Sequence, residues 1–321
     1  MTDFQSKVVA DLKEKGLADS SIALYMRALE KLNGGKPFPS LAFLTKMPAI
    51  MEQIRRYKPN TQRSILIAIV SILNAVKGLP KSVSKWTNKY YEILKEVKRG
   101  VDAAEATGEK TDAQKENWLS WEEVESKMTS AAADAVATSS SSLTDTNKML
   151  DAVVLGLYVY LPPRRNKDYI DMVVARKVED APSDINVLDL SKTQFVFRNY
   201  KTASTYGTQT INAPEELMTL ITKYLQARGV MKELEPPTGK KKVVVRTTSV
   251  PFLVQPSGKP FNANGITRIL NRIFGGKVGS SLLRHIYLTG KYGKVLEEQK
   301  KDAEAMANSV DIQNKTYIKN T

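Results

Sequence analysis

The chain has 321 residues, 42% of them hydrophobic, with a formal net charge of +14 and an isoelectric point near 9.6. This length and apolar content predict a globular protein of two domains, each with its own core. The absence of cysteine and the single histidine exclude disulfides, cysteine nucleophiles and cysteine-bound zinc, and they remove nearly all histidine-based metal sites and hydrolytic triads.

Targeting and membrane signals are missing from the sequence. No run of eighteen apolar residues occurs, and charged residues are spread over the first thirty positions where a signal peptide would have an apolar core. We therefore expect a soluble protein that is neither exported nor membrane-bound.

Positive charge is concentrated in two segments. Lysine and arginine outnumber acidic residues in 1–100 and again in 151–321, whereas acidic residues dominate 101–150. Two basic bodies joined by an acidic spacer are typical of a protein that closes around a polyanion such as nucleic acid. Composition does not identify the polyanion, and an ordinary basic protein has the same balance.

Apolar residues recur at helical spacing through residues 1–100, which predicts a bundle of four or five helices. The later helices are expected over Leu44–Tyr57, from Asn60 to Val76, and from about Ser84 to Arg99. Basic side chains off the apolar stripes would suit contact with phosphates, although a solvated surface explains any one of them equally well. These residues are Lys58, Arg63, Lys77, Lys81, Lys85 and Lys89.

Residues 101–116 contain hardly any large apolar side chain and are predicted to form an acidic interdomain linker. A second domain is expected over 117–321. Its first helix should begin after Ser120, because a serine cap followed by Glu123 has the spacing of a capping box.

The second domain is predicted to be a mixed α/β domain. A helix from Asp145 to about Leu161 should stop at Pro162-Pro163, and alternating segments predict an antiparallel sheet. Those segments are Asn186–Leu190, Gln194–Tyr200, Tyr206–Asn212 and, with a weaker pattern, Val250–Gln255. Further predictions are a hairpin loop at Lys201–Thr205, helices at 214–228 and 264–274, and a basic loop at Glu235–Lys242. The whole chain is therefore expected to be mainly α with a small antiparallel β-sheet.

Three kinds of residue suit the metal-free cleavage of a phosphodiester. Arginine holds two phosphate oxygens with its planar fork, and Arg165 (or Arg164) and Arg284 stand at predicted helix ends. Lysine on a tight hairpin, here Lys201, can protonate the leaving oxygen. A tyrosine such as Tyr317 can attack the phosphorus where cations favour the phenolate.

These segments resemble the motifs of the tyrosine recombinases, the phage-type integrase superfamily. "Tyr-Leu-Pro-Pro-Arg-Arg-Asn-Lys-Asp-Tyr" (160–169) is similar to the first-arginine motif, whose spacing pairs Arg165 with Asp168. "Asn-Tyr-Lys-Thr" with "Tyr-Gly" (199–207) resembles the lysine hairpin. "Leu-Leu-Arg-His" (282–285) resembles the second-arginine box, and "Met-Ala-Asn-Ser" followed by "Thr-Tyr-Ile-Lys" (306–319) resembles the box of the nucleophile. The residues of the first motif, especially "Pro-Pro-Arg-Arg-Asn", are similar to those of integrase-like proteins of large DNA viruses and their satellites.

The resemblance implies a helical core-binding domain over 1–100, a catalytic domain over 117–321, and double-stranded DNA as the partner. Tyr317 would form a 3′-phosphotyrosyl intermediate, Arg165 and Arg284 would hold the phosphate, and Lys201 would act as the acid. The resemblance further implies a homotetramer on paired DNA sites and no cofactor. It implies an intracellular, DNA-associated location, which for an enzyme of viral genome integration would be the host nucleus or a viral factory.

Two positions depart from the family pattern. Ser281 stands where the family has a histidine three residues before the second arginine, and Asn308 stands where it has His or Trp nine residues before the tyrosine. Both side chains can donate hydrogen bonds, but neither takes a proton at neutral pH. His285, the only histidine, follows the arginine at a position that often supports the fold. The resemblance thus leaves Ser281, Asn308 and His285 as candidate phosphate contacts without an evident general base.

Other readings remain open. A type IB topoisomerase would use similar residues to relax supercoils, and a DNA-binding relative would keep the basic surfaces without cleavage. No spacing of Asp and Glu supports a magnesium-dependent nuclease. At single positions, Tyr317 can be a packed tail residue, the Arg164-Arg165 pair can cap a helix, and Lys201 can be solvated.

Overall fold

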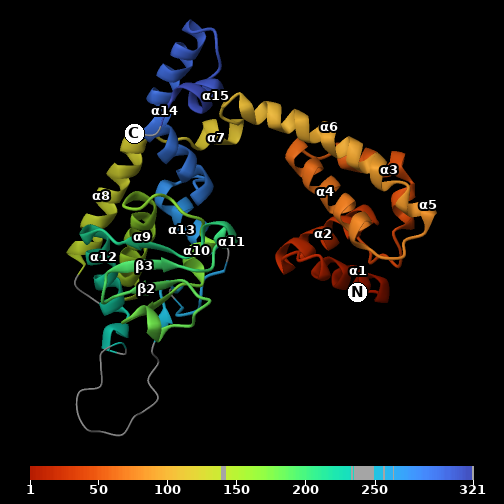
Figure 1. Ribbon diagram of the computed structural model, residues 1–321. Coiled ribbons are helices and arrows are strands. Elements are labelled where there is room, and N and C mark those ends of the chain that lie inside the picture. The colour runs from red at the N-terminus through yellow and green to blue at the C-terminus, as the bar shows by residue number, and fades with distance from the viewer. Residues whose placement is uncertain (139–141, 233, 235–248, 256, 263, 320–321) are drawn as a thin grey trace. The chain divides into compact units, whose positions relative to one another are not determined.

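The structure is a computed structural model that describes residues 1–138, 142–232, 234, 249–255, 257–262 and 264–319. The chain forms two compact units, Met1–Lys110 and Thr111–Thr321. Each unit has its own cluster of buried apolar side chains. The described part of the chain is mainly helical (Figure 1). The predicted basic loop Glu235–Lys242 lies outside the described residues.

The first unit is a bundle of helices. Its elements are α1 (Asp3–Glu14), α2 (Asp19–Leu32), a 3-10 turn η1 (Ala42–Thr45), α3 (Met47–Arg55), α4 (Pro59–Ala75), α5 (Lys81–Ser84) and α6 (Thr87–Ala106). The central helix α4 packs against α1, α2, α3 and α6, and it has the most apolar sequence of them, with Leu66, Ile69 and Ile72 fully buried. The buried hydroxyl of Tyr90 on α6 donates to the carbonyl of Leu44 at 2.8 Å and so ties α6 to η1.

Helix α6 runs into the segment predicted as a linker. It continues to Ala106, and a further helix, α7 (Asp112–Asn117), begins five residues after the turn at Thr107. Ala and Glu are frequent in this segment and are strong helix formers. The lack of large apolar residues therefore does not prevent helix formation here. Arg63 on α4 lies 3.5 Å from Asp102 and joins the extended part of α6 to the bundle.

The second unit combines helices with a small sheet. After α7 they are α8 (Trp121–Ala137), α9 (Leu143–Val159), α10 (Lys167–Ile170), α11 (Ala203–Tyr206), α12 (Glu215–Ala227), α13 (Gly265–Phe274), α14 (Ser280–Ala305) and α15 (Val310–Ile312), with 3-10 turns η2 (Val178–Asp180) and η3 (Val230–Lys232) and a π-helical turn η4 (Gln313–Tyr317). Helix α9 is buried along most of its length and packs against α8, α12 and α13. None of the helices in the described residues has the length and apolar character needed to cross a membrane.

The sheet has five short strands in the order β4-β3-β2-β1-β5. They are β1 (Val173–Ala175), β2 (Val187–Asp189), β3 (Gln194–Phe197), β4 (Gln209–Asn212) and β5 (Ser249–Pro251). β2–β3, β3–β4 and β1–β5 are antiparallel, but β1 and β2 are parallel, with Val173 opposite Val187. The prediction of a purely antiparallel sheet was therefore wrong: the sheet is mixed. The three-residue strand β1, which the sequence pattern did not predict, inserts between β2 and β5 and reaches β2 through a crossover that contains η2.

Aromatic side chains join the sheet to the helices beside it. Tyr169 on α10 makes edge-to-face contacts with Tyr158 of α9 at 6.0 Å and with Phe195 and Phe197 of β3 at 6.3 and 5.8 Å between ring centroids. All four rings are fully buried. This cluster fixes the segment between α9 and α10, which carries Arg164 and Arg165, against the sheet.

Candidate active site

Arginines from distant parts of the sequence line one pocket of the second unit. The pocket has a volume of about 310 Å³. Its walls are formed by the segment after α9, by the connection between β3 and β4, and by the start of α14. The lining residues are Pro162, Pro163, Arg164, Arg165, Asp168, Tyr200, Thr202, Tyr206, Gln209, Ile211 and Arg284. The site is therefore built within a single unit.

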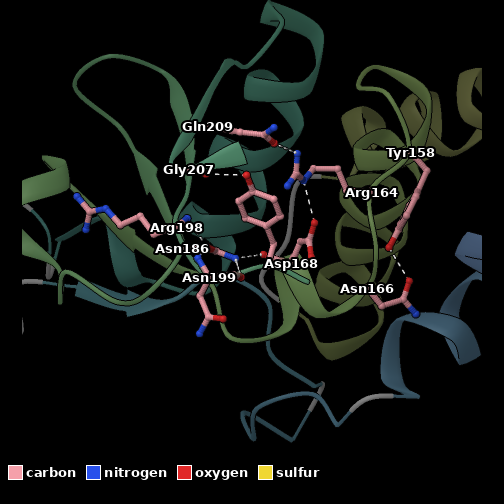
Figure 2. A network of polar contacts seen from close by, with 10 residues as sticks. Tyr158, Arg164, Asn166, Asp168, Asn186, Arg198, Asn199, Gly207 and Gln209 are labelled. Atoms are coloured by element: carbon pink, nitrogen blue, oxygen red, sulfur yellow. Dashed lines mark hydrogen bonds and ion pairs between the residues drawn. The ribbon is translucent and has the colours of Figure 1, made fainter. Parts of the chain in front are cut away.

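Pro162 and Pro163 end α9 as predicted, since α9 stops at Val159 with Tyr160 as its C-cap. The chain then turns, and a network of hydrogen bonds fixes the turn. The hydroxyl of Tyr158 donates to Oδ1 of Asn166 at 2.8 Å, and Nδ2 of Asn166 donates to Oγ1 of Thr267 on α13 at 2.9 Å. These hydrogen bonds hold the segment that carries Arg164 and Arg165; Figure 2 shows Arg164 and the contact between Tyr158 and Asn166.

Arg164 is held tightly. Its Nε donates to Oδ2 of Asp168 at 2.9 Å, and one terminal nitrogen donates to Oε1 of Gln209 at 2.8 Å, as Figure 2 shows. The guanidinium carbon lies 3.9 Å from the ring centroid of Phe197 and 5.0 Å from that of Tyr200. The Arg164 side chain is only 15% exposed. Its charge is paired and its planar group is stacked, so it forms part of the pocket wall.

Arg165 and Arg284 have no carboxylate partner among the described residues, and both are half-buried. Arg284 stands in the second turn of α14, where its Nε donates to the carbonyl of Ser280 at 3.3 Å. The sequence motif pairs Asp168 with Arg165, but in the structure the ion pair of Asp168 is with Arg164. Two guanidinium groups without an ion pair among the described residues give this pocket a positive charge that suits an anion.

Asp168 faces the three arginines from the pocket wall. It is 3% exposed, and its Oδ1 is buried without a hydrogen-bond partner. Burial raises the pKa of the Asp168 carboxyl, while the guanidinium groups of Arg164, Arg165 and Arg284 oppose that rise. The contact from Nε of Arg164 to Oδ2 of Asp168, at 2.9 Å, is the closest of these opposing interactions that the structure describes.

The connection between β3 and β4 forms the opposite wall. Asn186 supports it, since Nδ2 of Asn186 donates to the carbonyls of Asp168 and Asn199 and its Oδ1 accepts from the backbone N–H groups of Arg198 and Asn199. The hydroxyl of Tyr200 donates to the carbonyl of Gly207, a residue whose φ of 66° favours glycine. These contacts fix the short helix α11, which ends at Tyr206.

Lys201 stands in the turn before α11 and is exposed. The strands β3 and β4 are paired as a hairpin, but they are shorter than predicted, and α11 occupies part of their connection. Both sequence neighbours of Lys201, Tyr200 and Thr202, line the pocket, whereas the Lys201 side chain does not. The lysine is therefore at the rim of the connection that forms the wall.

The remaining predicted site residues do not line the pocket. Ser281 and His285 flank Arg284 on α14 and are exposed. Asn308 follows the end of α14, and its Oδ1 is buried without a partner. Tyr317 ends η4 and is 60% exposed.

The length of α14 separates Tyr317 from the pocket in space. Nε2 of Gln299 donates to Oδ1 of Asn314 at 2.7 Å, so the segment after α14 folds back onto its C-terminal half. Gln299 lies fifteen residues beyond Arg284 on a continuous helix, which is about 22 Å at 1.5 Å per residue. The pocket and the tyrosine are thus separate features in this conformation.

Tyr206 was not predicted as a site residue. It is 67% exposed and lines the pocket together with Thr202 and Gln209. The only sequence signal for Tyr206 as a site residue is the pair Tyr206-Gly207 within the predicted lysine hairpin. This pair does not show on which face of the β3–β4 connection the Tyr206 ring lies.

Comparison with protein-family models, with curated proteins and with solved structures gave no match for this chain. Among the described residues, no group of three or more His, Asp or Glu side chains lies close enough together to hold a metal ion.

Proposed function

We propose that this chain is a site-specific DNA recombinase or integrase of the tyrosine recombinase type, which cleaves and rejoins DNA strands through a covalent 3′-phosphotyrosyl intermediate. The observation that carries the proposal is the presence in the lining of one pocket of Arg165 and Arg284, neither of which has a carboxylate partner within the part of the chain that the structure describes. The order of the other motif residues along the chain supports it.

The roles follow from the charges. Arg165 and Arg284 bind the non-bridging oxygens of the scissile phosphate, and their charge stabilises the additional negative charge of the transition state. Arg164, neutralised by Asp168, positions the segment that carries Arg165. Lys201, at the rim, protonates the leaving 5′ oxygen, and a 5′ hydroxyl later attacks the phosphotyrosine and restores the phosphodiester.

The proposal requires the segment that carries Tyr317 to leave its place on α14. The described contacts that hold this segment include the hydrogen bond from Gln299 to Asn314 and a 3.6 Å contact from Nε2 of Gln313 to Sδ of Met306. Such a hydrogen bond contributes only about 1 kcal/mol net, so binding of DNA can offset the loss. Once released, Tyr317 loses its phenolic proton to solvent, and the phenolate attacks the phosphorus held by the two arginines while the bond to the 5′ oxygen breaks.

Charge supports DNA as the partner. The first hundred residues and residues 151–321 are each strongly basic, and cationic surfaces bind the phosphate backbone of DNA with little dependence on sequence. A homotetramer on paired sites belongs to the same proposal, because exchange of strands between two duplexes requires four cleavages.

A DNA-binding relative without cleavage activity is a second candidate. The observation in its favour is that Tyr317, Ser281, His285 and Asn308 do not line the arginine pocket. Incubation with a nicked suicide DNA substrate distinguishes the two, because a recombinase becomes trapped as a protein–DNA adduct that survives denaturing electrophoresis. Binding without any adduct would leave the second candidate.

A further inference from the structure

Helix α14 carries a stripe of exposed apolar side chains. More than half of the large exposed apolar residues among the described residues lie on α14 or in the segment after it. Leu288, Tyr292, Val295 and Leu296 are between 45% and 59% exposed, and their spacing of four, three and one residues places them on one face of the helix. We call these four residues the α14 stripe.

The opposite face of α14 is packed against its own unit. The rings of Tyr287 and Trp121 make an edge-to-face contact with centroids 5.2 Å apart. Gly290 lies so close to Trp121 that an added Cβ would come within 3.0 Å of the Trp121 Cβ. Because these two positions face α8, the α14 stripe faces away from it. Within α14 itself, Nζ of Lys291 lies 5.2 Å from the ring centroid of Tyr292 and 3.4 Å from the hydroxyl of Tyr287.

The spacing is that of a helix-pairing seam. Leu288, Tyr292, Val295 and Gln299 follow one another at intervals of four, three and four residues, the alternation seen where two helices pack side by side. Gln299 is hydrogen-bonded to Asn314, and Ala303 beyond it is buried. The segment after α14 therefore closes the seam at this end, and the open part is about three turns long.

Charges beside the seam indicate the partner and its direction. Lys291 and Glu298 are seven residues apart and lie on the same flank of the α14 stripe. In an antiparallel pair of identical helices, residues of the same flank meet, so Lys291 of each copy faces Glu298 of the other. In a parallel pair, Lys291 would face Leu296, and Glu298 would meet no cation of the other copy.

We propose that two copies of this chain pair through the α14 stripe, with the two helices antiparallel about a twofold axis near Gly293 and Lys294. Tyr292 of each copy packs against Val295 of the other across this axis. Such an interface is isologous, as closed dimers require. It is short, so the dimer dissociates on dilution. The proposal does not depend on DNA cleavage.

The first test is sedimentation velocity of the full-length protein without DNA over a range of concentrations. The wild type should shift from monomer to dimer as concentration rises, whereas Tyr292→Glu/Val295→Glu should stay monomeric. Leu24→Glu, at an exposed leucine of α2 that is 57% exposed, is the matched control and should dimerise like the wild type. A wild type that is monomeric at all concentrations overturns the proposal. That result would mean that another surface, such as the chain's own first unit, covers the α14 stripe.

The second test is a charge swap. Lys291→Glu alone should weaken the dimer by at least tenfold, because two like charges then meet at each end of the seam. The double variant Lys291→Glu/Glu298→Lys should restore dimerisation, because the reciprocal pairs are rebuilt with reversed sign. A double variant that is as weak as the single one contradicts the antiparallel register.

Direction can be tested by cross-linking, since the chain has no cysteine. Tyr292→Cys/Val295→Cys should form an intermolecular disulfide under mild oxidation, because these positions face each other across the axis. Leu288→Cys should not, because the two copies of residue 288 are separated by about 16 Å along antiparallel helices, beyond the reach of a disulfide. Cross-linking of Leu288→Cys would show a parallel pair and overturn the proposal.

Discussion

The ion pair between Arg164 and Asp168 leaves the neighbouring arginine free. Nε of Arg164 and Oδ2 of Asp168 are 2.9 Å apart, and the two side chains are 15% and 4% exposed. Adjacent residues in the sequence thus have different surroundings: Arg164 is paired and stacked on Phe197, whereas Arg165 has no carboxylate partner in the described residues. This difference supports the proposed roles, a structural one for Arg164 and phosphate binding for Arg165.

Arg164→Ala should destabilise the second unit by about 3 kcal/mol, because it leaves the buried carboxylate of Asp168 without its partner. Denaturant unfolding followed by tryptophan fluorescence measures the change. Arg176→Ala, at an exposed arginine just after β1, serves as the control and should change the unfolding free energy by less than about 0.5 kcal/mol. Equal stability of the two variants would contradict the structural role of Arg164.

Arg165→Ala and Arg284→Ala should each reduce DNA cleavage by about 10²–10³-fold, the loss typical of removing one donor that stabilises transition-state charge. Their unfolding free energies should stay close to that of the wild type, since neither forms a buried ion pair. Single-turnover cleavage of a nicked duplex is the measurement. If Arg164→Ala loses cleavage while remaining as stable as the wild type, the choice between the two arginines is wrong.

Asp168→Asn should change how stability depends on pH. Burial raises the folded-state pKa of Asp168 above its ordinary value of 3.8, so between those two values the folded state binds more protons than the unfolded state. The contribution of Asp168 to stability is therefore fully present below pH 3.8 and is lost as pH rises through the raised pKa. Asparagine cannot titrate, so the unfolding free energy of the variant relative to the wild type should increase with pH across that window. A difference that is flat or falls with pH would contradict this account.

DNA binding should weaken steeply with salt. Each phosphate contacted by a cation contributes a slope of about −0.9 to the plot of log K against log salt concentration. Arg284→Ala should make that slope less steep by about one unit, because one phosphate contact is lost. Fluorescence anisotropy with a labelled duplex measures both slopes. An unchanged slope would mean that Arg284 does not bind a phosphate in the ground state.

Local signals in the sequence predicted much of the second unit. The capping box of Ser120 and Glu123 is present at the start of α8, and Pro162-Pro163 follows the end of α9, because caps and prolines act on the backbone within a few residues. Helices α12 and α13 lie within the predicted ranges for the same reason. These features depend little on the rest of the fold.

Features that depend on distant contacts were not predicted. Strand β1 is three residues long, and its pairing with β2 and β5 decides that the sheet is mixed; periodicity cannot be read in so short a segment. The pairing of Asp168 with Arg164 follows from the turn of α10 and from the stacking of Arg164 on β3. The spacing of residues along the chain predicts neither of these contacts. The position of Tyr317 at the end of η4 likewise depends on how the last segment folds back onto α14.

The central claim is that Tyr317 is the nucleophile of a DNA strand-cleaving enzyme, and mapping the site of the covalent adduct tests it most directly. The full-length protein is incubated with a suicide substrate, digested with protease and nuclease, and the nucleotide-bearing peptide is identified by mass spectrometry. We expect the adduct on Tyr317, its loss in Tyr317→Phe, and its retention in Tyr206→Phe, the matched variant of the exposed tyrosine that lines the pocket. An adduct on Tyr206, or one that persists in Tyr317→Phe, would contradict the assignment, and no adduct in the wild type would contradict strand cleavage itself.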